Sequence, residues 1–197
     1  MTDYWNHNSA YHDWIVGIAT QHRGDVLDVG CGDGLLAQRL SPVSATVTGI
    51  DMDPSATVRA RARTSGLANV SIDTVGFDEH VGVDASYDVV TFVAALHHLD
   101  LRSSLRRARS LLRPGGELVV VGLSANTTPS DWVLSALQVP VVRVASWWHG
   151  EARDIGVVTA EPREGLREIR AIADQEVPGA RIRRGLYYRY LLRWRRG

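Results

Sequence analysis

Short apolar runs alternate along most of the chain with segments in which apolar residues recur every three or four positions. The short runs are typical of buried strands, and the longer spacing is typical of helices with one buried face. Their alternation predicts an α/β fold in which helices cover both faces of a parallel sheet. The predicted strands cover residues 26–29, 46–50, 70–75, 87–94 and 117–121, and the predicted helices cover 11–18, 35–40, 54–63 and 101–112.

Several boundaries follow from residues with special backbone preferences. Asp53, which precedes a proline, and Asp100 predict helix starts, because a carboxylate caps free N–H groups and proline fits the first turn. We expect the Ser-Pro pair at 41–42 to stop a helix, and the Pro-Gly-Gly run at 114–116 to end another and lead into a strand. The Glu-Pro pair at 161–162 predicts the start of the last helix.

Three glycines on alternate positions, Gly30, Gly32 and Gly34, follow the first predicted strand, and a predicted helix comes directly after them. We call residues 30–34 the glycine loop. Glycine lets the backbone approach a ligand closely and adopt positive φ. Asp51 ends the next strand, 17 residues after Gly34, where its carboxylate can accept hydrogen bonds from two ribose hydroxyls. The sequence therefore predicts a nucleoside ligand.

The glycine spacing and several later segments resemble the class I S-adenosylmethionine-dependent methyltransferases. The matching segments are 28–34 with the acid Asp28, 51–52, 86–90, 95–99 and 111–118. Dinucleotide enzymes use Gly-x-Gly-x-x-Gly instead, so an NAD-dependent reductase is the weakest alternative. The resemblance implies a Rossmann-like, doubly wound sheet of seven strands, mostly parallel with an antiparallel seventh strand. The implied cofactor residues are Asp28, Gly30, Cys31, Gly32, Gly34, Asp51, Met52, Phe77, Asp78, Val93 and Ala94.

The predicted adenine site departs from the family pattern. Relatives commonly have an aspartate where this chain has Gly76. Asp78 then accepts from the adenine amino group while Phe77 packs on the ring; alternatively, the backbone at Phe77 recognises adenine and Asp78 is a solvated charge. We favour Asp78 at this point.

Two histidines, His97 and His98, follow the fourth predicted strand. The resemblance places them beside the transferable methyl group or near it. Histidine titrates near neutral pH, so either residue is a candidate base for a hydroxyl or amine nucleophile. A packing or capping role is an equally good interpretation, and the sequence does not indicate which ring faces the site.

Two aromatic segments are candidates for the substrate site. The resemblance implies that the N-terminal arm covers the cofactor, and a long insertion after the fifth strand is typical of a lid over an apolar or aromatic substrate. The alternative is that these aromatics cover the sheet edge, anchor the insertion or form a dimer contact. The candidates are Tyr4, Trp5, His7, Tyr11, His12, Trp147, Trp148 and His149.

The whole chain of 197 residues is predicted to form one domain. We divide it into an N-terminal helical arm (1–23), a cofactor-binding core (24–123), a predicted substrate lid (124–160), and a last helix with a terminal strand pair (161–197). Arginines concentrate at residues 181–196. One interpretation is a basic strip that binds RNA or an acidic substrate. The other, which we favour, is an edge strand whose charges prevent pairing with another sheet.

Charge and cysteine content exclude several classes. The 22 basic residues, all arginine, balance 22 acidic ones, which argues against nucleic acid or a membrane as partner. The single cysteine, Cys31, excludes an internal disulfide framework, and the histidines lack metal-ligand spacing, so no metal is predicted. Without a recognisable signal segment we expect a cytoplasmic protein, monomeric or homodimeric.

These observations predict a methyltransferase of class EC 2.1.1.- that uses S-adenosylmethionine and releases S-adenosylhomocysteine. The expected acceptor is an oxygen or nitrogen of a small, apolar or aromatic molecule. Two alternatives stay open: an RNA or protein methyltransferase that uses the arginine-rich tail, and a non-catalytic subunit that binds S-adenosylmethionine.

Overall fold

The computed structural model describes residues 8–125, 162–185 and 189–197. The strands in these ranges form one seven-stranded sheet. The strand order is β3-β2-β1-β4-β5-β7-β6. Strands β1 to β5 are parallel, and β7 is antiparallel to both of its neighbours. The predicted seven-stranded sheet with an antiparallel seventh strand is thus confirmed. The strands are β1 Asp25–Val29, β2 Thr46–Asp51, β3 Val70–Thr74, β4 Tyr87–Val93, β5 Leu112–Leu123, β6 Arg181–Arg184 and β7 Arg189–Arg195.

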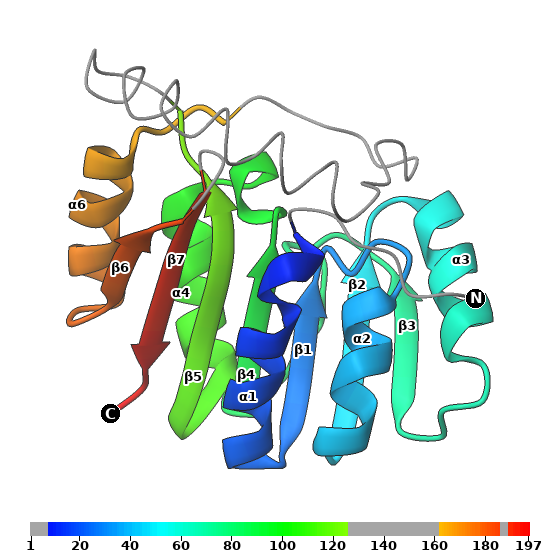
Figure 1. Ribbon diagram of the computed structural model, residues 1–197. Coiled ribbons are helices and arrows are strands. Elements are labelled where there is room, and N and C mark those ends of the chain that lie inside the picture. The colour runs from blue at the N-terminus through cyan, green and yellow to red at the C-terminus, as the bar shows by residue number, and fades with distance from the viewer. Residues whose placement is uncertain (1–7, 126–161, 186–188) are drawn as a thin grey trace.

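Helices cover both faces of the sheet, with α1, α2 and α3 on one face and α4 and α6 on the other (Figure 1). Within the described ranges, no helix has both the length and the apolar composition needed to cross a membrane. The helices are α1 His12–His22, α2 Leu35–Leu40, α3 Pro54–Thr64, α4 Leu101–Leu111 and α6 Leu166–Glu176, with short 3-10 turns at η1 Ser9–Tyr11, η2 Ser41–Val43 and η3 Leu96–His98.

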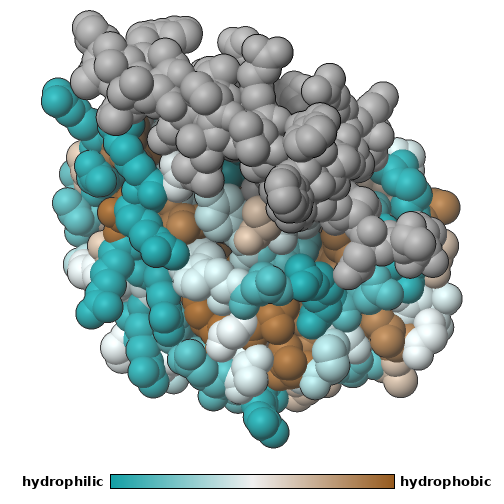
Figure 2. Space-filling model, viewed as in Figure 1, coloured by the Kyte–Doolittle hydropathy of each residue, from teal (hydrophilic) through white to brown (hydrophobic). Residues whose placement is uncertain are grey.

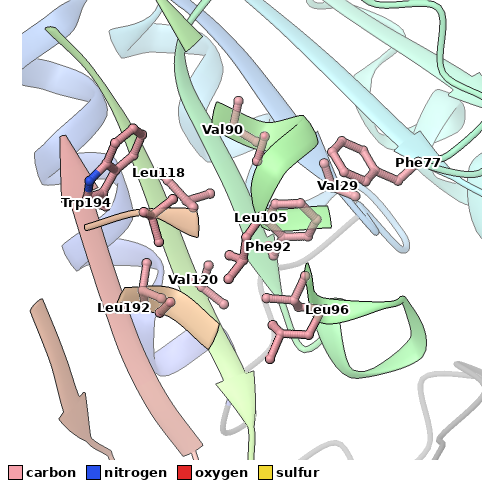
Figure 3. Close-up of a cluster of buried hydrophobic side chains, with 14 of the residues drawn as sticks. Val29, Phe77, Val90, Phe92, Leu96, Leu105, Leu118, Val120, Leu192 and Trp194 are labelled. Atoms are coloured by element: carbon pink, nitrogen blue, oxygen red, sulfur yellow. The ribbon is translucent and has the colours of Figure 1, made fainter. Parts of the chain in front are cut away.

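The strands contribute to a separate core on each face because their side chains alternate. Val26 and Val89 pack toward α1 and α2, whereas Val90 and Phe92 pack toward α4 and α6. Figure 3 shows the second cluster, in which Phe92 and Leu105 meet at its centre. Each of these fully buried side chains stabilises the fold by about 1.5–3 kcal/mol.

The strand order reverses between β1 and β4. From β1 the chain moves outward through β2 and β3, then returns to place β4 on the other side of β1. The connections leaving β1 and β4 therefore diverge at their carboxyl ends, which is where open α/β sheets bind ligands.

The predicted helix starts are confirmed by their caps. Asp53 Oδ1 accepts from the Ser55 N–H at 2.8 Å, and Asp100 Oδ1 accepts from the Ser103 N–H at 2.8 Å. Each cap satisfies a donor that the helix itself leaves unpaired, and is worth about 1 kcal/mol. The predicted stop at 41–42 is also confirmed, because α2 ends at Leu40 and the proline falls in the first turn of η2.

Two other predicted boundaries are wrong. Strand β5 begins at Leu112, and the run at 114–116 forms a bulge within it, where Gly115 has φ +80°. Helix α6 begins at Leu166, after Gly165, and not at 161–162. In both cases a proline or glycine that is typical of a boundary lies a few residues away from the observed start of the element.

Strands β6 and β7 form the edge of the sheet and carry the arginine-rich tail. Tyr190, Leu192 and Trp194 alternate along β7 and are buried in the core on the α4 face of the sheet. Arg193 lies on the opposite face, where its guanidinium donates to both carboxylate oxygens of buried Glu117, at 2.5 and 3.0 Å. Figure 2 shows that the surface over β6 and β7 is predominantly hydrophilic.

Candidate functional site

The glycine loop connects the end of β1 to the start of α2. Gly30, Gly32 and Gly34 have φ values of +71°, +55° and +79°, a left-handed conformation that favours glycine. The backbone N–H groups of Gly30 and Cys31 donate to the Ile50 carbonyl at 2.8 and 3.0 Å. These bonds fix the loop against the end of β2.

The three glycines meet different surroundings. A Cβ on Gly30 would lie 2.4 Å from the Cβ of Ala95, which follows β4, and a Cβ on Gly34 would lie 3.0 Å from Ala60 of α3. A Cβ on Gly32 would meet none of the described residues within 4 Å. Gly30 and Gly34 therefore serve packing, and Gly32 exposes the backbone that a ligand can approach.

We expect Gly30→Ala to destabilise the protein by at least about 2 kcal/mol more than Gly32→Ala. Both substitutions impose a left-handed alanine, which costs about 1–2 kcal/mol, but only the first also forces a methyl group into Ala95. Urea denaturation measures the difference. Gly17→Ala, in the exposed part of α1, is the control and should raise stability by about 0.5–1 kcal/mol. Equal losses at positions 30 and 32 would contradict the contact.

Asp51, at the end of β2, is joined to the glycine loop. Its Oδ2 accepts from the Gly32 N–H at 2.9 Å, and its Oδ1 accepts from the Asp53 N–H at 2.9 Å. The carboxylate is half-buried, and the neighbouring Met52 side chain is 75% exposed. An oriented carboxylate and an exposed apolar side chain thus lie beside the open part of the loop.

Asp28 is a buried acid on β1, with 1% of its surface exposed. Burial raises its pKa to about 7, and the negative charge of Asp51 adds to the shift. Its Oδ2 has no hydrogen-bond partner among the described residues, and neither has Oγ1 of fully buried Thr91, its register partner on β4. Two adjacent strands thus present unsatisfied polar atoms on the α1 face of the sheet, an arrangement that suits a polar ligand group or a water.

The end of β4 faces the glycine loop through Ala95. Ala94 has φ +51°, and its N–H donates to the Val121 carbonyl at 2.8 Å, while Val93 and Ala94 are half-buried. The turn η3 then carries both histidines, whose ring centroids lie 4.1 Å apart. His97 is half-buried and His98 is exposed. The structure thus distinguishes two residues that the sequence left equivalent.

The expectation that the Phe77 ring packs on a ligand is wrong. The ring is 3% exposed and packs edge-to-face on Phe92, with 5.1 Å between ring centroids. Figure 3 shows it beside Val29 within the core. Asp78 is exposed, so the alternative in which the backbone at Phe77 serves the site agrees better with the structure. Gly76 has open space around it, because among the described residues a Cβ there would approach only Glu79 Oε2, at 4.0 Å.

Cys31, within the glycine loop, is a buried side chain in the core on the α1 face. Burial raises the pKa of its thiol far above the usual range, so the thiol stays protonated. A nucleophilic role is excluded by that environment, and any contribution to the site comes through its backbone.

The predicted substrate residues fall mostly outside the described ranges. Of those described, Tyr11 lies in η1, with its hydroxyl 2.8 Å from where a Cβ on Gly185 would lie, and buried His12 begins α1. No group of three potential metal ligands occurs among the described residues. Outside the described residues lie Tyr4, Trp5, His7, Trp147, Trp148 and His149.

Sequence reasoning missed Thr91 and Arg63, although each leaves a signal. Thr91 is the only polar residue in the apolar run 89–93. Arg63 shares a helical stripe with Ala56 and Ala60 at i, i+4 and i+7, so a charge occurs on an otherwise apolar face. A polar residue on a buried face indicates a specific partner.

Comparisons with known proteins agree with this arrangement. A family model described as a methyltransferase domain matches residues 27–118. An uncharacterized methyltransferase of Mycobacterium tuberculosis is 37% identical over an alignment of 210 positions, gaps included, that covers 99% of this chain and 98% of the relative. A ubiquinone biosynthesis O-methyltransferase of Erwinia tasmaniensis is 37% identical over 128 residues, 62% of this chain and 51% of the relative. A solved structure with the same fold is that of the N-methyltransferase NodS from Bradyrhizobium japonicum, in complex with S-adenosyl-L-homocysteine. It aligns with a TM-score of 0.63 and 18% identity, over 97% of this chain and 88% of NodS.

Proposed function

Because this chain belongs to the class I S-adenosylmethionine-dependent methyltransferases, we propose that it transfers a methyl group from S-adenosylmethionine to an oxygen or nitrogen of a small, apolar or aromatic molecule. The observation that carries the proposal is the hydrogen bond from Gly32 to Asp51. It joins an open, left-handed stretch of backbone to a carboxylate suited to ribose hydroxyls, and so supports a nucleoside site.

The described residues fit the parts of such a cofactor. Asp51 would hold the ribose hydroxyls, and the exposed Met52 side chain would cover the adenine. Asp28, with Thr91 beside it, would hold the ammonium of the methionine part, since an unsatisfied carboxylate oxygen suits a cationic donor. Val93 and Ala94 at the end of β4 would line the opposite wall, across from Gly30.

The cofactor supplies an electrophilic methyl group bound to a sulfonium. The protein must align the acceptor atom, exclude water and, for a hydroxyl or ammonium acceptor, take a proton. His97 is the better candidate for the proton acceptor, because it is half-buried beside the end of β4 whereas His98 is exposed.

A small-molecule acceptor is favoured by charge and by the relatives. The chain carries no excess of basic residues, which polyanionic substrates usually require. The relative of Erwinia tasmaniensis is named as an O-methyltransferase of ubiquinone biosynthesis, which supports an oxygen of a small molecule as the acceptor here.

Calorimetric titration of the purified protein tests the cofactor. We expect S-adenosylmethionine and S-adenosylhomocysteine to bind and NADH not to bind, because the loop lacks the Gly-x-Gly-x-x-Gly spacing that places a pyrophosphate on the helix. Binding of NADH alone would overturn the proposal. Binding of both sulfur ligands, without turnover of any acceptor in a broad panel of phenols, amines and carboxylates, would favour a non-catalytic binding subunit instead.

A further inference from the structure

We infer that Arg63 is a positioning residue that holds the glycine loop in its ligand-binding conformation through a buried ion pair with Asp33. The inference rests on the proposed function, because the loop is the proposed cofactor site. Arg63 lies in the last turns of α3, 30 residues along the chain from Asp33, and does not itself belong to the glycine loop or to β2.

One guanidinium contacts three separate atoms of the loop and of the helix that follows it. Arg63 Nη2 donates to Asp33 Oδ2 at 2.7 Å, Nε donates to the Asp33 backbone carbonyl at 3.0 Å, and Nη1 donates to Gln38 Oε1 at 3.3 Å. The rigid fork of the guanidinium thus grips both the side chain and the main chain of a single loop residue. A lysine could not reproduce this geometry.

Burial makes the pair a strong constraint. The Arg63 side chain is 2% exposed and that of Asp33 is 15% exposed. A guanidinium taken out of water is very costly without a partner, so a shift of the loop that separates the two groups is strongly disfavoured. The loop therefore stays where Asp33 can reach Arg63.

The position of Asp33 turns this constraint into a functional one. Asp33 lies between Gly32 and Gly34, both left-handed, and glycine has more backbone freedom than any other residue. Fixing the Asp33 carbonyl and carboxylate limits that freedom on either side, and so fixes the direction of the Gly32 N–H that bonds Asp51. Helix α3 thereby supports the proposed site at two points, because the N–H of its N-cap residue, Asp53, also donates to Asp51.

The test compares three variants with the wild type. Arg63→Met keeps an apolar stem and removes every donor, Arg63→Lys keeps the charge without the fork, and Asp33→Asn removes the negative charge. Arg106→Met is the control, because Arg106 also pairs with a buried carboxylate, that of Glu176, although its own side chain is exposed and the pair joins α4 and α6 on the other face of the sheet. Each variant is titrated with S-adenosylmethionine under conditions where circular dichroism shows it fully folded.

We expect Arg63→Met and Asp33→Asn to weaken binding about tenfold or more, Arg63→Lys to weaken it less, and Arg106→Met to leave it within about twofold of the wild type. In the free protein labelled with 15N-glycine, we expect the Gly32 and Gly34 amide signals to shift in Arg63→Met and to stay in place in Arg106→Met. A stability loss alone would not separate the variants in this way.

Binding within twofold of the wild type in all three variants would overturn the inference and leave the pair a structural contact only. If the wild type itself binds no S-adenosylmethionine, the proposed function fails, and the amide signals still decide whether Arg63 sets the loop conformation. If Arg63→Met does not fold, Arg63→Lys and Asp33→Asn carry the same test.

Discussion

Asp51→Ala is expected to weaken S-adenosylmethionine binding by at least about 100-fold while the chain stays folded. The substitution removes the proposed ribose acceptor and also frees the N–H groups of Gly32 and Asp53, which both donate to this carboxylate. Hydrogen bonds to a charged group are worth about 1.5–3 kcal/mol each, and about 2.7 kcal/mol corresponds to about 100-fold in affinity. Titration calorimetry measures the change directly.

Two further substitutions make the result specific. Asp53→Ala removes the N-cap of α3 from the same loop and is expected to cost about 1 kcal/mol of stability with little loss of affinity. Asp51→Asn keeps one acceptor oxygen and should bind with intermediate affinity. Unchanged affinity in Asp51→Ala would remove Asp51 from the ribose site and leave it as a support for the loop only.

The sequence predicted the framework of the site because that framework depends on short-range patterns. Apolar runs and their spacing gave the parallel strands, and the caps at Asp53 and Asp100 fixed two helix starts. The glycine positions gave the loop, because a left-handed backbone restricts the choice of residue strongly. Each of these signals is contained within a few neighbouring residues.

What the sequence did not predict depends on contacts between distant segments. Nothing near Phe77 shows that its ring turns back to Phe92 instead of facing a ligand, and the two burial environments of His97 and His98 arise only from the fold. Arg63 meets Asp33 because Gly34 allows α2 and α3 to approach closely. Such pairings are set by tertiary packing, which local propensity does not encode.

Asp28→Asn is expected to reduce the dependence of stability on pH and at the same time to weaken cofactor binding. In the unfolded chain Asp28 ionises near pH 3.8, whereas in the native protein burial, aided by the charge of Asp51, raises its pKa to about 7. Between these two values the native state binds one proton more than the unfolded state. The free energy of unfolding of the wild type therefore falls as pH rises through this window, and levels off above about pH 7.

The size of the effect follows from the shift. One pKa unit corresponds to about 1.4 kcal/mol, so about 3 kcal/mol of the loss falls between about pH 5 and pH 8. Asparagine cannot ionise, so the stability of Asp28→Asn relative to the wild type should rise by about that amount over the same range. Urea denaturation at both pH values measures it, and Asp53→Asn is the control, because hydrogen bonds from Ser55 lower the pKa of that half-buried carboxyl and keep it ionised throughout this range. A constant difference between variant and wild type would mean that Asp28 is ionised at all these pH values or protonated at all of them.

Cofactor binding should respond to the same titration in the opposite direction. The ionised carboxylate is the form that attracts the ligand's ammonium, so the affinity of the wild type for S-adenosylmethionine should rise by up to about tenfold per pH unit as pH approaches 7 from below, and that of Asp28→Asn should stay low and flat. Folding alone favours a neutral side chain at this fully buried position, where one carboxylate oxygen has no partner among the described residues. A residue that serves ligand binding is expected to behave in this way: its carboxylate destabilises the free protein at neutral pH but strengthens ligand binding there. A variant that binds as tightly as the wild type at about pH 7.5 would show instead that the buried acid serves no ligand.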